Sequence, residues 1–547
     1  MPVKKNQIIP LTIESLSSDG SGIGHYEGEA VFVPATAPGD VLQVRIVKDM
    51  GRYAFGITEQ VLSPSPDRRP ADCAVAGPCG GCCFRHLTYP AELAAKRQFV
   101  ADAFARIGGL ALPVEPVLPS PEVERYRNKA QFPVGRDKNG RICVGFYAGR
   151  THRIVPCADC ALQPQVFNEI AAFLCEAFAR YGIEPYDETS GSGLIRHIFL
   201  RRGEHCGQIM VCLVSTGARL PHAQALCAAL RTQFPDIRSI LLNINSRRTN
   251  VILGQETLTL AGEPFIEDTL CGVPIRLGPL SFYQVNTPAA EQLYRTAAAF
   301  AALQPGERLL DLYCGMGTIG LSMAEQCGEL IGVEIVPEAI AAAKVSAARM
   351  GDGIAAKCRF FCADAGEAAR RLAGEHLRPD VIVLDPPRKG CDEATLGAVV
   401  EMSPSRVVMV SCNPATAAWD VKFLAAHGYL PQKVQPADLF PRTKHVETVI
   451  LLSRKTPDDT IEVDLDLDEL DITSAESKAT YQEIKDYVLK EFGLKVSTLY
   501  ISQVKRKYGI EVGEHYNISQ KENQKVPQCP KEKEDAIRAA LEHFAMI

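Results

Sequence analysis

The run DLYCGMGTIG at residues 311–320 decides the fold class of this chain. It follows an apolar segment typical of a strand, and its glycines at 315, 317 and 320 fit the G-x-G-x-x-G pattern of a loop that opens a helix. In open α/β sheets, such a loop lies at the carboxyl edge of the first strand, where a cofactor binds. The run therefore predicts a Rossmann-like α/β domain with a cofactor site.

The flanking sequence from about 290 to 453 extends this pattern. Strand-like runs alternate with helical ones, in the order RLLDLYCG, LIGVEI, RFFCADA, VIVLDPP and RVVMVSCN. Such alternation is typical of a parallel, doubly wound sheet. We therefore predict one α/β domain over residues 281–455.

Acidic residues stand at the ends of three successive predicted strands, namely Glu334, Asp364 and Asp385. A dinucleotide needs its pyrophosphate at the helix N-terminus, whereas S-adenosylmethionine has no phosphate and needs acids to fix its ribose and adenine. Three acids at three strand ends favour S-adenosylmethionine over a nicotinamide cofactor. For any one of them, the alternative is a helix N-cap.

A cysteine and a carboxylate accompany this predicted cofactor site. Cys412 follows the strand RVVMVS, and Glu447 begins the run ETVILL, which reads as a final strand. A thiolate that adds to carbon 6 of uracil makes carbon 5 nucleophilic enough to accept a methyl group, and a base must then remove the carbon 5 proton. We predict Cys412 as the nucleophile and Glu447 as the base, although a lone cysteine is more often a buried apolar group.

Three other functions remain open at this point. Methylation of an amino group fits the DPP motif but leaves Cys412 and Glu447 without a role. A nicotinamide-dependent iron–sulfur oxidoreductase explains the glycine loop and the cysteines, but it also does not need that pair. A non-catalytic RNA-binding protein explains only the regions that precede the α/β domain.

The rest of the chain predicts a multidomain protein. Short apolar runs and turn signals predict a small β-barrel over 1–64, and mixed patterns predict a central α+β domain over 65–280. An acidic linker over 456–476 precedes a small helical module over 477–547, which we interpret as either an RNA-binding or a packing module. No apolar run is long enough to span a membrane and no secretory signal is present, so we expect a cytoplasmic protein, and we further expect a monomer.

A basic segment follows the cysteine-rich region. Residues 122–153 carry eight Lys and Arg side chains against three acids, interleaved with Tyr126, Phe132, Phe146 and Tyr147. Cations beside rings are typical of a groove for single-stranded RNA, and a solvated charged hairpin is the alternative.

Three cysteines, Cys73, Cys79 and Cys82, form a C-x5-C-x2-C pattern that is able to converge on one metal centre. A fourth ligand is needed, and Cys83, Cys157 and Cys160 are the candidates. Because nineteen cysteines in a cytosolic chain are not expected to form disulfides, metal binding is a reasonable interpretation. Spacing alone does not distinguish zinc from an iron–sulfur cluster.

The strings FYQVN, DLYCGMG, GVEIVPEAI, VLDPPRKG, SCNP and FPRTKHVE together resemble the RNA uracil-C5 methyltransferases. Within that family, the chain is most similar over residues 5–453 to the 23S ribosomal RNA branch, which has an N-terminal TRAM barrel and an iron–sulfur cluster. The resemblance implies methyl transfer from S-adenosylmethionine to a uridine of RNA, favouring 23S rRNA, with transfer RNA as the alternative substrate.

The resemblance also implies roles for individual residues. Gln284, Tyr313, Glu334 and Asp385 would contact S-adenosylmethionine, Asp364 would lie near its adenine, and Phe282 would lie near the flipped base. Cys160 would complete a [4Fe–4S] cluster with Cys73, Cys79 and Cys82, with zinc as the alternative. One departure is Ser346, where the family usually has asparagine.

Overall fold

The computed structural model describes residues 3–70, 72–149, 151–455, 481–508 and 529–544. The chain divides into two compact units, Met1–Asp459 and Thr460–Ile547, and each is described by itself. The predicted acidic linker over 456–476 lies outside the described residues. In the described ranges, every helix is too short or too polar to cross a bilayer.

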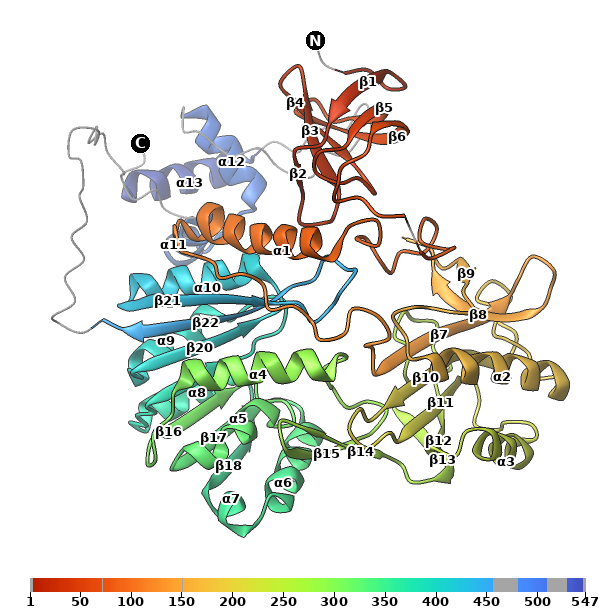
Figure 1. Ribbon diagram of the computed structural model, residues 1–547. Coiled ribbons are helices and arrows are strands. Elements are labelled where there is room, and N and C mark those ends of the chain that lie inside the picture. The colour runs from red at the N-terminus through yellow and green to blue at the C-terminus, as the bar shows by residue number, and fades with distance from the viewer. Residues whose placement is uncertain (1–2, 71, 150, 456–480, 509–528, 545–547) are drawn as a thin grey trace. The chain divides into compact units, whose positions relative to one another are not determined.

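The N-terminal region is a curled six-stranded sheet, as the alternating apolar pattern predicts (Figure 1). Its strands are β1 (Ile8–Thr12), β2 (Ser15–Leu16), β3 (Gly22–Tyr26), β4 (Glu29–Val33), β5 (Val41–Asp49) and β6 (Tyr53–Ser63). Their order is β1-β5-β6-β4-β3-β2, and alternate residues such as Val31, Val33 and Val44 fill the interior. The pair β4–β6 is parallel, whereas the other strand pairs of this sheet are antiparallel.

The central region is a second sheet with helices on one face. It contains β7 (Lys129–Arg136), β8 (Ile142–Tyr147), β9 (Ile154–Pro156), β10 (Ile195–Arg202), β11 (Ile209–Ser215), β12 (Ile237–Ile244) and β13 (Glu256–Gly262). Helices α2 (Gln165–Tyr181) and α3 (Ala223–Gln233) share one apolar core with this sheet. Phe199 and Met210 belong instead to a core that this sheet shares with the C-terminal region of the unit.

A hairpin and a helix lead into the C-terminal sheet. The hairpin is β14 (Ile266–Leu270) with β15 (Val273–Leu277), and the helix is α4 (Thr287–Ala301). The strands that follow are β16 (Arg308–Leu312), β17 (Glu329–Glu334), β18 (Cys358–Cys362), β19 (Val381–Leu384), β20 (Arg406–Ser411), β21 (Tyr429–Ala437) and β22 (Glu447–Arg454). The helices between them are α5 (Thr318–Ser322), α6 (Pro337–Arg349), α7 (Asp352–Lys357), α8 (Ala365–Gly374), α9 (Glu393–Met402) and α10 (Pro414–Ala426).

The strand order of this sheet is β18-β17-β16-β19-β20-β22-β21. The first five strands are parallel, as predicted, and β22 pairs antiparallel with both β20 and β21. Because β22 runs opposite to β20, the start of β22 lies beside the end of β20. The sheet therefore brings the residues at these two ends to one edge.

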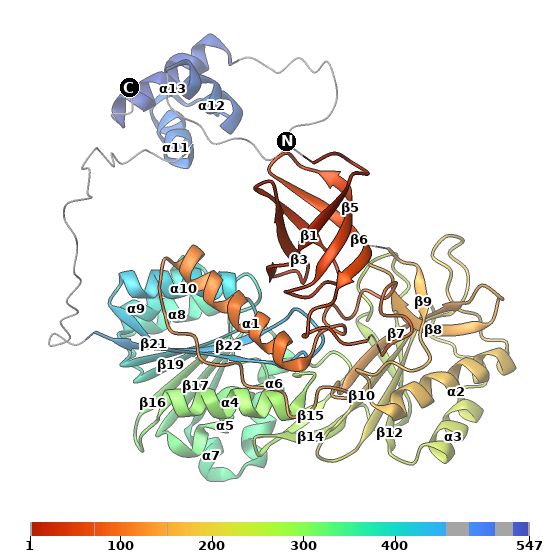
Figure 2. The ribbon, with the colours of Figure 1, turned by 45° about the horizontal axis from the view of Figure 1, so that its top comes forward.

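The helix α1 (Tyr89–Ala103) packs on the C-terminal sheet, although we predicted it within the central domain. Figures 1 and 2 both show α1 alongside α10, and Val100, Phe104 and Val114 join the core beneath it. The segment 114–118 also forms bridges to β21. Residues 89–118 are therefore part of the C-terminal α/β layer, which differs from the predicted 65–280 boundary.

The second unit contains three helices in its described residues: α11 (Tyr481–Phe492), α12 (Thr498–Lys507) and α13 (Lys531–His543). Their apolar faces meet in a small core that includes Ile484, Val488, Ile501 and Ile537. The described part of the predicted helical module over 477–547 is thus helical, as expected.

Candidate active site

The glycine loop after β16 adopts the strand-to-helix turn predicted from its sequence. Gly317 has a φ of +76° and caps α5, and a Cβ on Gly320 would lie 2.8 Å from Asp311 Oδ2. That oxygen accepts a hydrogen bond from the Gly320 amide at 2.9 Å. The glycines therefore allow the helix to begin directly above a buried carboxylate.

Asp311 is a site residue that the sequence reasoning did not single out. Its side chain is buried, and its Oδ1 has no hydrogen-bond partner among the described residues. Burial, with smaller contributions from the neighbouring Asp385 and Glu334, raises the pKa of Asp311 to about 8. The sequence does contain a signal for this residue, because Asp311 is the last polar residue of the strand before the glycine loop.

The acids at the strand ends lie where the parallel sheet predicts them. Glu334 accepts hydrogen bonds from the amides of Gly315 at 3.2 Å and Val336 at 3.0 Å. Asp385 follows β19, and burial raises its pKa to about 7. The edge thus concentrates carboxylates that favour a positively charged ligand, since a nearby cation stabilises their ionised forms.

Asp364 has a structural role in addition to its predicted one. It is the N-cap of α8, and its Oδ1 accepts hydrogen bonds from the amides of Gly366 at 3.0 Å and Glu367 at 3.2 Å. The helix-cap alternative is therefore correct for this acid. Contact with adenine stays a prediction.

The remaining predicted cofactor and substrate residues lie on loops at the same sheet. Tyr313 has a φ of +66°, and its hydroxyl lies 3.5 Å from Thr395 Oγ1 in α9. Gln284 is held through its carbonyl oxygen, which accepts a hydrogen bond from the Asn128 side chain at 2.7 Å. Phe282 is 71 % exposed, so its ring is free to meet a ligand.

Cys412 and Glu447 lie at adjoining strand ends. Ser411 of β20 pairs with Thr448 of β22. Cys412 follows Ser411 and Glu447 precedes Thr448, so these two residues meet at one edge of the sheet. Glu447 is 5 % exposed, and burial raises its pKa to about 8, with a smaller contribution from Asp385. The pair that the sequence predicted is therefore brought together.

Arg388, in DPPRKG, is a second residue that the sequence reasoning missed. Burial raises the pKa of the Cys412 thiol, and Glu447 adds to this rise, whereas the charge and the hydrogen bond of Arg388 lower it. The Arg388 carbonyl accepts hydrogen bonds from the Asn413 side chain at 3.0 Å and from the Thr416 hydroxyl at 3.4 Å. These bonds fix the backbone of Arg388 beside the loop that carries Cys412. Arg388 is thus a thiolate-stabilising group that the sequence did not reveal.

The loop over residues 438–446, between β21 and β22, is fixed by buried charges. Lys96 of α1 is fully buried and donates hydrogen bonds to Glu92 at 2.8 Å and to Asp438 at 2.7 Å. The Arg442 amide donates to Glu92 at 2.7 Å. We call this the buried charge network, and it ties α1 to the loop that leads to Glu447.

The cysteine-rich loop contacts the same segment. The amides of Cys83 and Phe84 donate hydrogen bonds to the Arg442 carbonyl at 3.0 and 3.1 Å. The guanidinium groups of Arg85 and Arg442 both reach Glu124, at 3.1 and 3.3 Å. The loop that carries the predicted metal ligands thus packs directly on the 438–446 loop.

The predicted metal ligands share one neighbourhood. The thiols of Cys79 and Cys82 each interact electrostatically with Cys160, and Cys160 also hydrogen-bonds to Cys157. Burial raises the pKa of Cys82 to about 12. Within the described ranges, no three Cys, His, Asp or Glu side chains converge closely enough to hold a metal ion.

The basic segment differs from the predicted groove. Tyr126 and Phe132 are buried in the core, so the prediction that they stack on bases is wrong. Arg125 forms an ion pair with Asp159 at 2.7 Å, and Arg141 forms one with Asp137 at 3.1 Å. Most of this segment is a charged hairpin on a packed sheet, which was the alternative interpretation.

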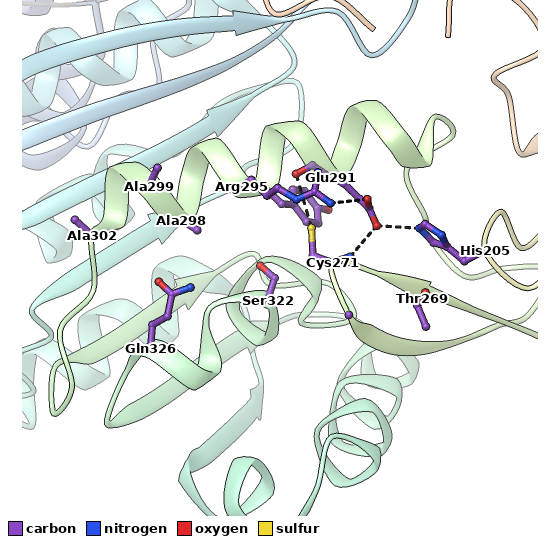
Figure 3. Close-up of a pocket in the computed structure, with 12 residues that line it drawn as sticks. His205, Thr269, Cys271, Glu291, Arg295, Ala298, Ala299, Ala302, Ser322 and Gln326 are labelled. Carbon is purple, nitrogen blue, oxygen red and sulfur yellow. Dashed lines mark hydrogen bonds and ion pairs between the residues drawn. The ribbon is translucent and has the colours of Figure 1, made fainter. Parts of the chain in front are cut away.

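A cavity of about 740 Å³ lies beside α4 and the β14–β15 hairpin (Figure 3). Glu291 extends from α4, and its carboxylate forms hydrogen bonds with His205 at 2.9 Å and with Arg295 at 2.8 Å. None of the predicted site residues is among the described residues that line it. Tyr294 lines this cavity and its hydroxyl lies 3.3 Å from Thr318 Oγ1, so the cavity only adjoins the cofactor loop.

Comparison with known proteins agrees with this site. Residues 221–455 match the family model of tRNA (uracil-5-)-methyltransferases, and residues 2–58 match the TRAM domain. An uncharacterized RNA methyltransferase of Halalkalibacterium halodurans is 42 % identical over 83 % of this chain and 98 % of its own length. One from Listeria monocytogenes serotype 4b is 42 % identical over 82 % of this chain and 98 % of its own.

A solved structure supports the same grouping. The tRNA (uracil-54, C5)-methyltransferase of Pyrococcus abyssi, in complex with S-adenosyl-L-homocysteine, superposes with a TM-score of 0.65 at 27 % identity. The match covers 81 % of this chain and all of that one. The chain is a member of the tRNA (uracil-5-)-methyltransferase family of RNA methyltransferases, and its N-terminal sheet is a TRAM domain.

Proposed function

We propose that this protein transfers a methyl group from S-adenosylmethionine to carbon 5 of a uridine in RNA. The observation that carries the proposal is the meeting of Cys412 and Glu447 at adjoining strand ends, beside the carboxylates of Asp385 and Asp311. A nucleophilic thiol and a buried base are the two groups that methylation of a pyrimidine at carbon 5 requires and that methyl transfer to an amino or hydroxyl group does not.

The residues act in sequence. The Cys412 thiolate forms a bond to carbon 6 of uracil, and the electron pair of the 5,6 double bond moves towards carbon 5. S-adenosylmethionine would supply the methyl group to carbon 5 and leave as S-adenosylhomocysteine, which keeps the electron pair of the broken sulfur–methyl bond. Glu447 then takes the proton from carbon 5, the double bond re-forms, and the carbon–sulfur bond breaks to return the thiolate.

The electrostatics of the site fit these roles. Burial and Glu447 raise the pKa of Cys412, and Arg388 opposes that rise by stabilising the thiolate that attacks. Burial raises the pKa of Glu447 to about 8, which makes its carboxylate a stronger base than an exposed glutamate. Phe282 is exposed and available to stack on a base that has left its helix, as enzymes acting on a base require.

The described residues also fit S-adenosylmethionine. Asp311 Oδ1 is buried without a partner among the residues that the structure describes, and the mutual repulsion of Asp311, Asp385 and Glu334 is relieved by a cationic ligand. S-adenosylmethionine is such a ligand, because it carries a sulfonium group and an ammonium group. We assign Gln284, Tyr313, Glu334 and Asp385 to its binding, and Asp364 to the side of its adenine.

We propose 23S rRNA as the substrate, on the strength of the cysteine-rich loop that resembles the 23S rRNA branch. Transfer RNA is the second candidate, because the Pyrococcus abyssi enzyme acts on uracil-54 of tRNA.

The test is incubation of the purified protein with methyl-labelled S-adenosylmethionine and either unmodified 23S rRNA or unmodified tRNA, followed by nuclease mapping. Labelled 5-methyluridine at one site of one RNA is the expected result. Label in another nucleoside contradicts the Cys412 mechanism, and RNA binding without label supports a binding protein instead.

We further propose that Cys73, Cys79, Cys82 and Cys160 hold a [4Fe–4S] cluster, with zinc as the alternative. The support is that these thiols interact with one another and that four thiolates suit either centre. Anaerobic purification followed by iron, sulfide and zinc analysis distinguishes the two, and Cys160→Ser with Cys157→Ser as its matched control identifies the fourth ligand.

A further inference from the structure

Three aromatic rings gather on the outside of the TRAM domain. Phe32 lies on β4, and Tyr53 and Phe55 lie on the neighbouring strand β6, with Phe32 directly paired to Phe55. The ring centroids are 5.7 Å apart for Phe32–Tyr53 and Phe32–Phe55, and 5.6 Å apart for Tyr53–Phe55. Tyr53 is 38 % and Phe55 37 % exposed, so the rings form one continuous apolar surface facing solvent.

The strand pattern explains why these rings cannot be part of the core. Side chains alternate between the two faces of a strand, and Val31, Val33 and Ala54 occupy the inner positions with no exposure. Phe32, Tyr53 and Phe55 therefore occupy outer positions. Cross-strand aromatic pairs add some stability to the sheet, but these rings also expose apolar area to solvent.

Cations border the rings. Lys48 of β5 is directly opposite Phe55, and residues directly opposite in an antiparallel pair share a face. Arg52 immediately precedes Tyr53, and both cations are exposed. The nearby Asp49 is opposite the buried Ala54, and its carboxylate accepts a hydrogen bond from the Gly51 amide at 2.7 Å. The ring face is thus bordered by positive charge.

We propose that Phe32, Tyr53 and Phe55 form a stacking surface for unpaired bases of the substrate RNA, with Lys48 and Arg52 contacting its phosphates. The inference rests on the proposed RNA methyl transfer and assigns a binding surface to it. Aromatic side chains beside cations recognise single-stranded RNA, because every base has a face that stacks and every linkage has a negative charge. A protein partner would not require cations at the rim of the rings.

The test compares full-chain variants for binding of fluorescent oligouridine. Replacing Tyr53 and Phe55 together by Ala is expected to weaken binding about tenfold to a hundredfold, because stacking contributes about 1–3 kcal/mol per base. The slope of log Kd against log salt should not change, since stacking releases no counterions. Tyr53→Phe with Phe55→Tyr keeps both rings and should bind normally.

Two further variants sharpen the test. Replacing the exposed Val61 and Leu62 of the same strand by Ala removes apolar surface away from the rings and should leave binding unchanged. Lys48→Ala with Arg52→Ala should reduce the salt slope while the rings remain. Thermal unfolding of each variant separates a loss of stacking from a loss of folding.

Several results overturn the inference. These are failure of the wild-type protein to bind oligouridine, equal binding by the double Ala variant, or a change of assembly mass caused by that variant, which would make the surface an interface between copies. Methyl transfer keeps the two proposals apart. If the wild type labels no RNA, the proposed function fails; if it labels RNA and the ring variants keep the same KM, only the stacking surface fails.

Discussion

The Asn413 side chain donates a hydrogen bond to the Arg388 carbonyl at 3.0 Å, and this bond joins the loop that carries Cys412 to the loop that carries Asp385. The guanidinium of Arg388 consequently lies close enough to lower the pKa of the Cys412 thiol. Cys412, the proposed nucleophile, and the cation that opposes the rise of its pKa therefore come from two different strand ends, and the Asn413 and Thr416 side chains hold the two loops together.

Replacing Arg388 by Gln should raise the pKa of Cys412, because the group that lowers it is removed. The rate of Cys412 alkylation by iodoacetamide is expected to fall at pH 7 by severalfold or more, and its pH profile should move to higher pH. Lys389→Gln, at the exposed neighbouring cation, is the matched control and should leave the profile in place. An unchanged profile in Arg388→Gln would exclude Arg388 as the activating group.

Replacing Glu447 by Gln should trap the RNA on the protein. The Cys412 bond to carbon 6 still forms and the methyl group is still transferred, but no carboxylate removes the carbon 5 proton. A denaturation-resistant RNA–protein band is expected after incubation with S-adenosylmethionine and unmodified RNA. The double variant Glu447→Gln, Cys412→Ala should give no band, and a band in that variant would contradict the assigned nucleophile.

Glu447 should also make stability depend on pH. Its pKa is raised from 4.5 to about 8 on folding, so the stabilisation of its neutral form is complete below pH 4.5 and is lost as pH rises to about 8. Glu447→Gln, which stays neutral, should therefore gain stability relative to the wild type between pH 5 and pH 8. Urea denaturation of both proteins at several pH values measures this difference, and parallel curves would contradict the raised pKa.

Binding of S-adenosylmethionine should release protons. Asp385 and Asp311 have pKa values of about 7 and about 8, so both are partly protonated at pH 7, and a cationic ligand lowers these values. Calorimetry in buffers of different ionisation enthalpy counts the protons released. S-adenosylhomocysteine lacks the sulfonium charge and should release fewer, so equal release by both ligands would show that the sulfonium lies away from these acids.

Lys96→Met should destabilise the protein strongly. It leaves Glu92 and Asp438 buried without their shared cation, and breaking such a pair costs about 3–5 kcal/mol. The loss should be smaller at pH 5, where Glu92 protonates more easily, because burial already raises its pKa. Lys344→Met on the exposed side of α6 is the control and should change the free energy of unfolding little.

The sequence predicts the catalytic edge well because the parallel sheet follows from local patterns. Each strand is a short apolar run, and Glu334, Asp385 and Cys412 each stand at or just after the end of such a run. Since the carboxyl ends of parallel strands share one edge, adjacency in space follows without knowledge of packing. Glu447 is predicted from its chemistry, and its position depends on β22 running antiparallel beside β20.

Features that depend on long-range contacts were not predictable in this way. Arg388 is a cation in a loop, and only the fold shows that it faces Cys412. Tyr126 and Phe132 alternate with cations in the sequence, but the fold buries both rings in the core. The packing of α1 on the C-terminal sheet depends on Lys96 meeting Asp438, and no local pattern connects residues that far apart.

The buried charge network has a consequence for the order of biosynthesis. Lys96 and Asp438 are separated by 342 positions, so during translation α1 leaves the ribosome long before its acidic partner is made. Until then Lys96 has to stay in water or be covered by other proteins, because a buried ammonium with an incomplete set of partners is unstable. The newly made chain therefore cannot complete its proposed catalytic edge part by part, and a truncated product that ends before Asp438 would lack both Glu447 and the partner that holds α1 in place.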